Sequence, residues 1–406
     1  MSKANIITGL DIGTGTIKVL VVQKKPADGE LQVVSLIQEP AAGIRRGVVI
    51  NPEEVSEVLE RSLEQIKAET GTGIDSVYVN VGGSHLFLTP SHGLISVSRA
   101  DQRISEEDIS RVLQAAQTFS LPSNKEIFDA IVKEFIIDGQ SGIKEPLGLQ
   151  GVRLEAEVLA LGGFSPYLKN LTQAVLNSEL QILDLIPSPT ASARACLNNR
   201  QKELGVALLD IGAGTSGLAV FEEGDLIHLA ILPMGSSNIT NDIAIGLKTD
   251  IDIAERIKIE YGSCSLSPNQ SPPKKREKVD IGEETPLVFS HKQLTGIIEA
   301  RVSEIFREVN KELKKISREK LLPVGLVLTG GGSKLPKITE LAKKELKLPC
   351  KIGKPQALSG LEKDPSLSTV CGLILSGADL EKEGREITFG KGIGNKIKKI
   401  FKIFIP

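Results

Sequence analysis

The sequence contains no tryptophan, and aromatic residues make up only 3% of it. The interior of the folded chain must therefore be built from aliphatic side chains, chiefly those of isoleucine, leucine, valine and alanine. With 406 residues, the chain is long enough to bury a large core without disulfides or structural metals. At about 100–200 residues per domain, this length predicts two to four domains.

Cysteine is also scarce. The four cysteines, Cys196, Cys264, Cys350 and Cys371, lie far apart in the sequence and form no CxxC pair. We therefore expect four reduced thiols, as in a cytosolic protein. The histidines are equally scattered, and no spacing predicts a metal site built from cysteine and histidine.

Neither sign of charge is in excess. A net charge of −2, with 25% charged and 40% hydrophobic residues, is typical of a soluble globular protein and argues against binding of nucleic acid over the whole surface. The N-terminus has no charged leader followed by a long apolar stretch. No window reaches the roughly 20 apolar residues that span a bilayer. We expect a protein that is made and kept in the cytoplasm.

An internal repeat is the most informative feature present. Residues 11–16 read Asp-Ile-Gly-Thr-Gly-Thr, and residues 210–215 read Asp-Ile-Gly-Ala-Gly-Thr. Each copy follows a short apolar run and precedes another, so each predicts a strand, a tight turn and a returning strand. These strands are expected at residues 6–10, 17–23, 206–209 and 216–221. A duplication of such long period predicts two similar lobes.

Hydrophobic periodicity predicts the other elements. Helices are expected at residues 52–70, 105–119, 164–177, 190–197, 241–261 and 293–315, with strands at 74–81, 181–186 and 325–329. The helix at 105–119 starts with Ser-Glu-Glu-Asp, close to a capping-box pattern.

Two segments differ in composition from the rest. Residues 262–286 contain four prolines and the basic run Lys274-Lys275-Arg276, which predicts a mobile surface loop. A signal for nuclear import or nucleic-acid binding is the alternative interpretation of the basic run. Residues 379–392 are polar and contain glycine, and we interpret them as a linker.

The repeated turns are suited to phosphate. Backbone N–H groups of a tight turn converge on phosphate oxygens, glycine lets the chain come close, and threonine hydroxyls add donors. The candidate residues are Gly13, Thr14, Gly15 and Thr16 in the first turn and Gly212, Gly214 and Thr215 in the second. Ordinary hairpin turns are the alternative, which the presence of two copies disfavours.

Each turn begins with an aspartate, and Asp11 and Asp210 would repel phosphates that they touched directly. A Mg²⁺ ion held by carboxylates, phosphate oxygens and water removes this repulsion. The two aspartates are therefore candidate magnesium residues, acting through water.

Two further segments fit a nucleoside. Glu255 and Lys258 lie three residues apart on a predicted helix and share one face; the carboxylate would accept bonds from a ribose, although a plain surface pair is the alternative. The strand at 325–329 leads into Gly330, Gly331, Gly332 and Ser333 and then a helix from about residue 336. A strand, a glycine turn and a helix start are suited to a nucleotide.

Taken together, these segments resemble the actin/Hsp70/sugar-kinase ATPase superfamily. Residues 11–16 and 210–215 resemble its two phosphate motifs, 189–193 its first connecting helix, and 328–336 its adenosine motif. The resemblance implies an α/β fold with two actin-like lobes, each of RNase H-like topology, and ATP with Mg²⁺ as ligands.

Within that superfamily the chain resembles the FtsA family of bacterial cell-division proteins. The similarity lies in residues 235–244, which start with Gly235, in the Ile-Ile-Glu-Ala-Arg stretch 297–301, in the tail, and in 84–163, which resembles the inserted 1C subdomain. The implied domains are 1–83 (subdomain 1A), 84–163 (1C), 164–235 (end of 1A and 2A), 236–322 (2B), 323–378 (return to 2A and 1A), 379–392 (linker) and 393–406 (terminal helix).

The tail has the pattern of a helix that lies in a membrane interface. On a helix of 3.6 residues per turn, one face carries Ile393, Ile397, Ile400, Phe401 and Phe404, and the other carries Lys398, Lys399 and Lys402. The segment is too short to span a bilayer. Packing of the tail on its own protein is the alternative.

The family resemblance implies an ATP-binding, actin-like protein that polymerises on the inner face of the cell membrane at the division site and tethers FtsZ. It implies that the acidic FtsZ C-terminal peptide binds residues 236–322 and that other division proteins bind through 84–163. Because the peptide is acidic, Lys292 and Arg301 are candidate contacts, with ordinary surface cations as the alternative. Anionic lipids and a second copy are further partners; nucleic acid is not.

Hydrolysis of ATP is expected to be slow or undetectable. The position before Pro189, where Hsp70-like ATPases carry a catalytic glutamate, holds Ser188, so no catalytic residue is assigned. The competing functions are a PilM-like pilus-assembly adaptor of the same fold and, from another class, a sugar or acetate kinase.

Overall fold

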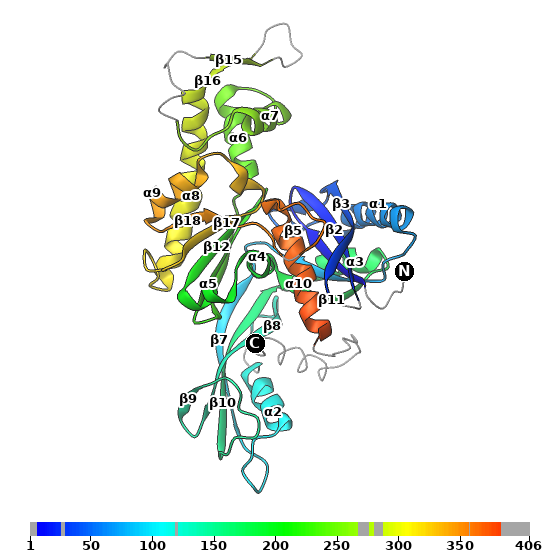
Figure 1. Ribbon diagram of the computed structural model, residues 1–406, viewed down its shortest axis with the longest axis vertical. Helices are drawn as coiled ribbons and strands as arrows, with labels where there is room; N and C mark the ends of the chain where they lie inside the picture. Colours follow the sequence, from blue (N-terminus) through cyan, green and yellow to red (C-terminus); the bar gives the residue numbers. More distant parts are fainter. Residues whose placement is uncertain are drawn as a thin grey trace. The chain divides into compact units, whose positions relative to one another are not determined.

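The computed structural model describes residues 6–25, 29–117, 121–266, 276–279, 287–356 and 358–382. The chain divides into two compact units (Figure 1). Unit 1 contains the chain up to Ser84 together with Leu171–Ala378, and unit 2 contains His85–Asn170 and the residues from Asp379 on. Each unit is described by itself.

The first sheet of unit 1 is a five-stranded mixed sheet in the order β11-β6-β1-β2-β3. Its strands are β1 (Ile6–Ile12), β2 (Thr16–Lys24), β3 (Leu31–Pro40), β6 (Ser76–Val81) and β11 (Gln181–Pro187). Strands β1 to β3 are antiparallel neighbours, whereas β6 runs parallel to both β1 and β11. The β1–β2 register sets Asp11 opposite Lys18, so the first glycine turn closes a regular hairpin.

The second sheet repeats this arrangement in the order β14-β13-β12-β17-β18. Its strands are β12 (Val206–Ile211), β13 (Ser216–Glu222), β14 (Asp225–Leu232), β17 (Gly325–Thr329) and β18 (Cys350–Ile352). Again three antiparallel strands, β12 to β14, are joined by two parallel ones. The duplicated lobes that the sequence repeat predicts are therefore present, each with one glycine turn between its first two strands.

Helices and short elements complete unit 1. They are β4 (Ile44–Arg45), β5 (Val48–Val49), α1 (Pro52–Thr70), α3 (Ser165–Asn177), α4 (Ser188–Cys196), α5 (Asn199–Leu204), α6 (Ser236–Leu247), α7 (Ile251–Tyr261), β15 (Arg276–Val279), β16 (Leu287–Ser290), α8 (His291–Lys315), the 3₁₀ turn η2 (Gly331–Lys334), α9 (Ile338–Leu346), the 3₁₀ turn η3 (Pro365–Leu367) and α10 (Ser368–Lys382). Helix α3 starts in unit 2, and α10 ends there.

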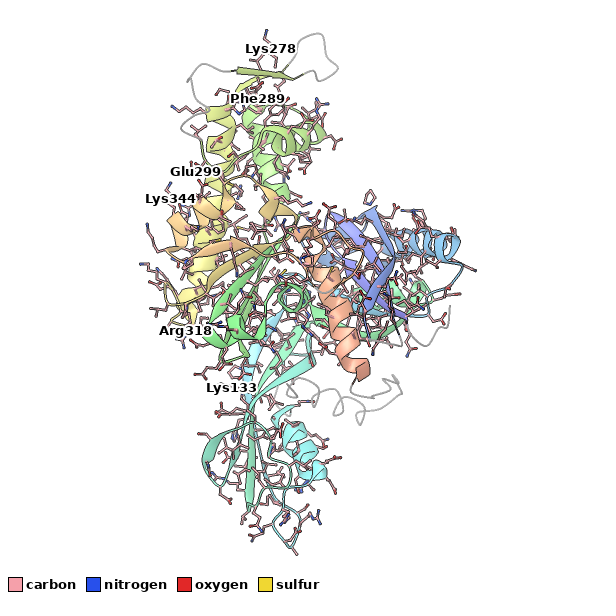
Figure 2. The ribbon with its side chains drawn as sticks, viewed as in Figure 1. Lys133, Lys278, Phe289, Glu299, Arg318 and Lys344 are labelled. Carbon is pink, nitrogen blue, oxygen red and sulfur yellow. The ribbon has the colours of Figure 1, made fainter. Side chains whose placement is uncertain are left out.

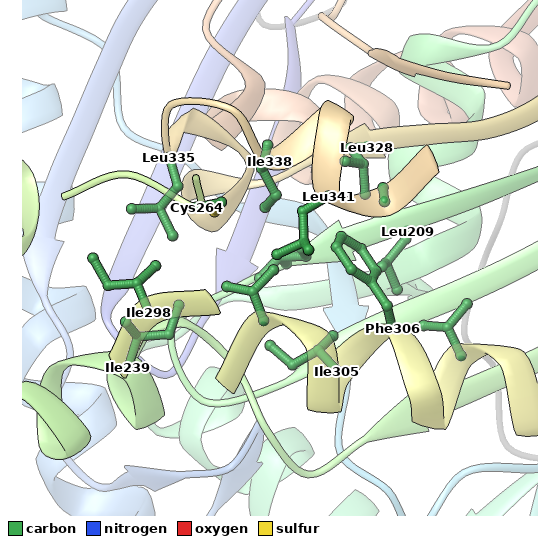
Figure 3. Close-up of a cluster of buried hydrophobic side chains, with 14 of the residues drawn as sticks. Leu209, Ile239, Cys264, Ile298, Ile305, Phe306, Leu328, Leu335, Ile338 and Leu341 are labelled. Atoms are coloured by element: carbon green, nitrogen blue, oxygen red, sulfur yellow. The ribbon is translucent and has the colours of Figure 1, made fainter. Parts of the chain in front are cut away.

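The core of the second lobe is aliphatic, as the lack of tryptophan predicts. Buried side chains of the sheet meet those of α8 and α9 around Phe306, Leu328 and Leu341 (Figure 3). Ion pairs lie on the outer side of the lobe: Lys344 of α9 binds Glu299 of α8 at 3.0 Å, and Arg318, which follows α8, binds Glu222 of β13 at 2.7 Å (Figure 2). Since the first pair is exposed and the second is only half-buried, we attribute most of the stability of the lobe to its apolar core.

Unit 2 is a four-stranded antiparallel sheet, in the order β7-β10-β8-β9, with one helix packed on it. The elements are β7 (Phe87–Ser96), α2 (Glu106–Gln117), β8 (Lys125–Ile137), β9 (Gln140–Ile143) and β10 (Arg153–Phe164). At Gly93 a Cβ would lie 2.1 Å from the carbonyl oxygen of Val112. The contact requires glycine, because any larger residue would force α2 off the sheet.

The structure corrects three predicted elements. The single helix predicted at 241–261 is two helices, because Lys248 adopts a left-handed conformation with φ 54° and Asp250 caps α7. The predicted loop 262–286 contains β15, which pairs with β16, while 267–275 and 280–286 lie outside the described residues. Helix α10 runs to Lys382, because no glycine or proline interrupts it over 379–382, so the linker prediction is wrong for these residues. Residues 383–406, including the predicted terminal helix, are also outside the described residues.

The capping box predicted at the start of α2 is present and carries a buried charge. The Asp108 carboxylate, 0% exposed, accepts hydrogen bonds from the N–H and hydroxyl groups of Ser98 and Ser105. Burial alone would raise the pKa of Asp108, but these bonds outweigh it and lower the pKa from 3.8 to about 2. The ionised form is thus the stable one in the folded protein.

We predict that Asp108→Asn destabilises unit 2 by about 2 kcal/mol at neutral pH, since one pKa unit corresponds to about 1.4 kcal/mol. Hydrogen exchange of the α2 amides should accelerate about thirtyfold. Because the folded pKa is the lower one, the stabilisation exists above about pH 4 and is lost as pH falls towards 2. Glu106→Gln, an exposed change in the same turn, is the control; equal exchange in the two variants would contradict the assignment.

Candidate functional site

The two glycine turns line one cavity of about 580 Å³ in unit 1. This volume is in the range of small-molecule sites, roughly 300–1,000 Å³. The predicted residues that line it are Asp11, Gly13, Thr14, Gly15 and Thr16 from the first lobe, and Asp210, Gly212, Thr215, Glu255, Gly330 and Gly331 from the second. The topology therefore brings together two sequence motifs that lie about 200 residues apart.

The turns lie against each other without room for side chains. A Cβ on Gly214 would lie 2.6 Å from Cγ2 of Thr14, and a Cβ on Gly15 would lie 2.8 Å from the Cβ of Ala213. None of the four turn glycines has a positive φ. Close approach of the two turns to each other therefore requires glycine here, whereas the sequence pattern predicts close approach to phosphate.

The N–H groups of Gly13 and Gly212 close their own turns. They donate to the carbonyl oxygens of Thr16 and Thr215, at 3.2 and 2.9 Å. They stabilise the turns and are not the phosphate donors that the sequence pattern indicates for them. The donors suited to a ligand are those at the tips, residues 14–16 and 213–215.

Asp11 is held by two residues that the sequence analysis missed. Lys18 donates to Oδ2 of Asp11 at 2.9 Å, and the Asn80 side chain donates to Oδ1 at 2.9 Å. Asn80 also accepts the N–H of Ile12 at 2.6 Å and donates to the hydroxyl of Ser188. The available signal was a lysine or asparagine within an apolar run, Lys18 within 17–22 and Asn80 within 77–81. The hairpin register explains the place of Lys18.

Asp210 is half-buried near the end of β12. Its carboxylate accepts hydrogen bonds from the hydroxyls of Ser192, at 2.5 Å, and Thr369, at 3.0 Å. Burial raises the pKa of Asp210, the negative charge of Asp11 raises it further, and the two hydroxyls act in the opposite direction. A cation nearby would stabilise the ionised form of Asp210.

The donor set fits magnesium rather than a transition metal. Among the described residues, no group of three or more His, Cys, Asp or Glu side chains could hold a metal ion. Magnesium takes one or two carboxylates and otherwise water and phosphate. Asp11 and Asp210 fit that role, and both carboxylates are already oriented by neighbouring side chains.

Glu255 and Lys258 are close, as predicted, but only Glu255 lines the cavity. Nζ of Lys258 is buried and donates to Oε2 of Glu255 at 2.6 Å and to the hydroxyl of Thr240 at 2.9 Å. It also donates to the carbonyl of Ser236 at 3.3 Å. Lys258 therefore orients Glu255 and does not itself line the cavity.

The glycine turn after β17 is divided between two roles. Gly330 has φ 81°, and a Cβ on it would lie 2.2 Å from Oδ1 of Asp210, so it must be glycine. Gly332 packs on Ile211, and the Ser333 hydroxyl donates to the carbonyl of Gly330 at 2.7 Å, behind the cavity wall. Of the four predicted residues, only Gly330 and Gly331 line the cavity.

Gly235 supports the second turn instead of lining the cavity. A Cβ on it would lie 2.5 Å from the carbonyl oxygen of Ala213. The next two N–H groups, those of Ser236 and Ser237, donate to the carbonyls of Gly212 and Ala213 at 2.8 Å. The start of α6 is thereby hydrogen-bonded to the second glycine turn.

The two predicted partner residues differ in availability. Arg301 is engaged with Asp242 through two bonds of 2.6 and 2.9 Å, and it also binds Glu304 at 2.5 Å. It joins α8 to α6, as a bidentate guanidinium–carboxylate pair does. Lys292 lies exposed in the first turn of α8, so it is the better placed of the two for a partner.

No helix in the described ranges is long and apolar enough to cross a membrane. The residues predicted to lie on a membrane, 393–405, are outside those ranges.

Solved structures of other proteins share the fold. The PilM-PilN type IV pilus biogenesis complex matches with a TM-score of 0.64 and 18% identity, over 92% of this chain and 98% of that one. MreB5 of Spiroplasma citri, bound to ADP, matches with 0.57 and 13%, over 94% and 98%. The MamK double helical filament matches with 0.50 and 12%, over 91% and 97%. The predicted actin-like fold is confirmed.

Sequence comparison is more specific. A family profile described as "Cell division protein FtsA" matches residues 207–372, and one described as "SHS2 domain inserted in FTSA" matches residues 83–161. Cell division protein FtsA of Pseudomonas aeruginosa is 35% identical over 391 residues, which cover 96% of this chain and 93% of that protein. The Bacillus subtilis protein is 33% identical over 390 residues, covering 96% and 87%. The chain belongs to the FtsA family of cell division proteins.

Proposed function

We propose that the chain binds ATP with Mg²⁺ between its two glycine turns and acts in cell division as an actin-like adaptor. In this role it polymerises on the inner face of the cell membrane at the division site and tethers FtsZ. The observation that carries the nucleotide proposal is the close opposition of the two turns on one cavity, each turn beginning with an aspartate.

The phosphates, the metal and the ribose each have a matching part of the cavity. The tips of the two turns offer backbone N–H groups to the phosphates, and Asp11 and Asp210 would hold the magnesium through water. Glu255, oriented by Lys258, would accept a bond from a ribose hydroxyl. A relative of the same fold, MreB5, is bound to ADP.

We propose that hydrolysis is slow or absent. A hydrolase needs a group that is free to activate water. In the cavity, Asp11 is bound to Lys18, Asp210 to Ser192, and Glu255 to Lys258. Asp252 also lines the cavity and is exposed, but it lies in the first turn of α7, the helix that we propose for the ribose, and not on a phosphate turn. Ser188 is not a base near neutral pH.

We predict that Gly214→Val weakens binding of a fluorescent ATP analogue by about tenfold or more, because the added side chain pushes the turns apart. Gly73→Val is the matched control, since a Cβ at Gly73 meets nothing within 4 Å. Equal affinity in the two variants would contradict the placement of the phosphates.

Phosphate release by the wild-type chain is measured in the same experiment. The expected rate is far below about 10 s⁻¹, the median for enzymes, and a rate near that value would contradict the proposed slow hydrolysis.

The terminal residues 393–405 support a membrane role by their pattern. Burial of each large apolar side chain contributes about 1.5–3 kcal/mol, and each lysine near an anionic leaflet adds about 1 kcal/mol. The cost of ordering the tail opposes both contributions. Binding of one copy should be modest and reversible, and polymerisation would strengthen it through multivalency.

We predict that the full chain floats with liposomes that contain anionic lipid and that deletion of residues 393–406 abolishes flotation. The substitution Phe401→Glu should act like the deletion, because it places a charge on the apolar face. Undiminished flotation of the deletion variant would assign membrane binding to another part of the chain.

Self-assembly and FtsZ binding complete the proposal. A double helical filament is known for MamK, which shares the fold, so an actin-like filament is the form of assembly we propose. For the acidic FtsZ peptide, we propose docking on 236–322 beside Lys292, since Arg301 is already paired.

We predict that Lys292→Glu weakens binding of an FtsZ C-terminal peptide about tenfold, through repulsion of like charges. Lys311→Glu, on the same helix but in an exposed pair with Glu308, should bind like wild type. The site would be wrong if both variants bound the peptide equally.

A PilM-like adaptor is the second candidate function, because the PilM-PilN complex shares the fold with a TM-score of 0.64. In that case the chain would reach the membrane through the tail of a membrane-protein partner, and the chain alone would not float with liposomes. A small-molecule kinase is a weaker alternative, since the carboxylates of Asp11 and Asp210 are already engaged; phosphorylation of a small substrate would favour it.

A further inference from the structure

Helix α1 carries a line of unpaired negative charge. Glu53, Glu57, Glu60 and Glu64 are exposed and follow one another at intervals of three or four residues, so they lie on one side of the helix. In the part of the chain that the structure describes, none of them forms an ion pair, and Arg61 and Lys67 are the basic residues of α1. The opposite side of α1 packs on the first sheet through residues such as Leu59 and Ile66.

A lysine face lies on the second lobe. It consists of the exposed residues Lys343, Lys347, Lys351, Lys354 and Lys363, from α9, the edge strand β18 and the segment that follows. None of the five has an ionic partner among the described residues. Two of the five, Lys354 and Lys363, line a hollow of about 440 Å³ whose wall also contains Leu335, Glu362 and Asp364, the last of which is paired with Lys334.

Pairing elsewhere on the surface makes these two sets distinctive. On α8, Glu308 binds Lys311 and Glu312 binds Lys315; on α9, Lys344 binds Glu299. Along the α1 line, like charges stand side by side and repel each other. The lysine face has an excess of positive charge, although the exposed Glu362 lies next to Lys363. An opposing surface of the other sign would therefore lower the energy of both.

The two surfaces cannot satisfy each other within one copy. Helix α1 covers the first sheet, whereas α9 and β18 belong to the second, and in the view of Figure 1 they lie on opposite sides of unit 1. Two copies placed side by side, however, can bring the α1 of one against the lysine face of the other.

We propose that a second copy of this chain docks its α1 glutamate line on the lysine face, as a lateral contact. The contact is heterologous, since each copy gives one surface and receives the other, so it extends into an open row of copies. The inference builds on the proposed self-assembly by naming a surface for it. It is independent of nucleotide, membrane and FtsZ binding.

Charge reversal tests the contact on the full-length chain. One variant carries Glu57→Lys, Glu60→Lys and Glu64→Lys, a second carries Lys351→Glu, Lys354→Glu and Lys363→Glu, and a third combines all six changes. Self-association is measured by sedimentation velocity at low and high ionic strength, because contacts between exposed charges are screened by salt. Glu106→Lys with Glu107→Lys, on exposed positions of α2, is the control, and fluorescent ATP binding checks that each variant is folded.

We expect each three-residue variant to self-associate with an affinity about tenfold lower than that of wild type, or lower still. The six-residue variant, and an equimolar mixture of the two three-residue variants, should regain association, because each restores opposite charges across the contact. The control should behave like wild type. Three outcomes would each overturn the proposal: loss of association that the six-residue variant does not recover, unchanged association of the three-residue variants, or a wild-type chain that stays monomeric at low salt. ATP binding and flotation test the proposed function separately.

Discussion

The structure depends on the approach of two backbone turns that leave no space for a side chain between them. Gly15 meets Ala213 and Gly214 meets Thr14 at distances that no Cβ would tolerate. Because the turns close two equivalent hairpins in two equivalent sheets, their opposition follows from the duplicated topology. The same approach brings two aspartates, Asp11 and Asp210, to one cavity, where burial and also the negative charge of Asp11 raise the pKa of Asp210. Two nearby carboxylates repel each other, and a cation bound together with phosphate would offset this repulsion.

A shell of polar side chains holds this arrangement. Lys18 and Asn80 orient Asp11, while Ser192 and Thr369 orient Asp210. Behind the second turn, Gly235 and the start of α6 bind its carbonyl groups, and Lys258 links that helix to Glu255. A ligand that moved the turns would therefore also move α6 and α7. Binding of nucleotide and the position of the lobe that we propose to bind FtsZ are in this way physically connected.

The sequence predicts the local parts of this structure well. The helix at 52–70 and the strand at 325–329 have the predicted bounds, because an apolar period and clear end signals coincide there. The actin-like fold and the inserted domain were predictable from the repeat and from the family resemblance. The break between α6 and α7 was not, since it depends on the left-handed conformation of the single residue Lys248. Nor could the partners of the aspartates be predicted: Thr369 lies 159 positions from Asp210, and only the assembled sheets bring the two together. The separate roles of Gly331, in the cavity wall, and Ser333, behind it, likewise depend on how the 3₁₀ turn packs.

A crystal structure of the chain with ATP and magnesium tests the central claim most directly. We predict phosphate oxygens within hydrogen-bonding distance of backbone N–H groups from both tips, residues 14–16 and 213–215, with the metal's water shell reaching Asp11 and Asp210. A nucleotide that contacts only one of the two turns, or that binds outside this cavity, would contradict the account.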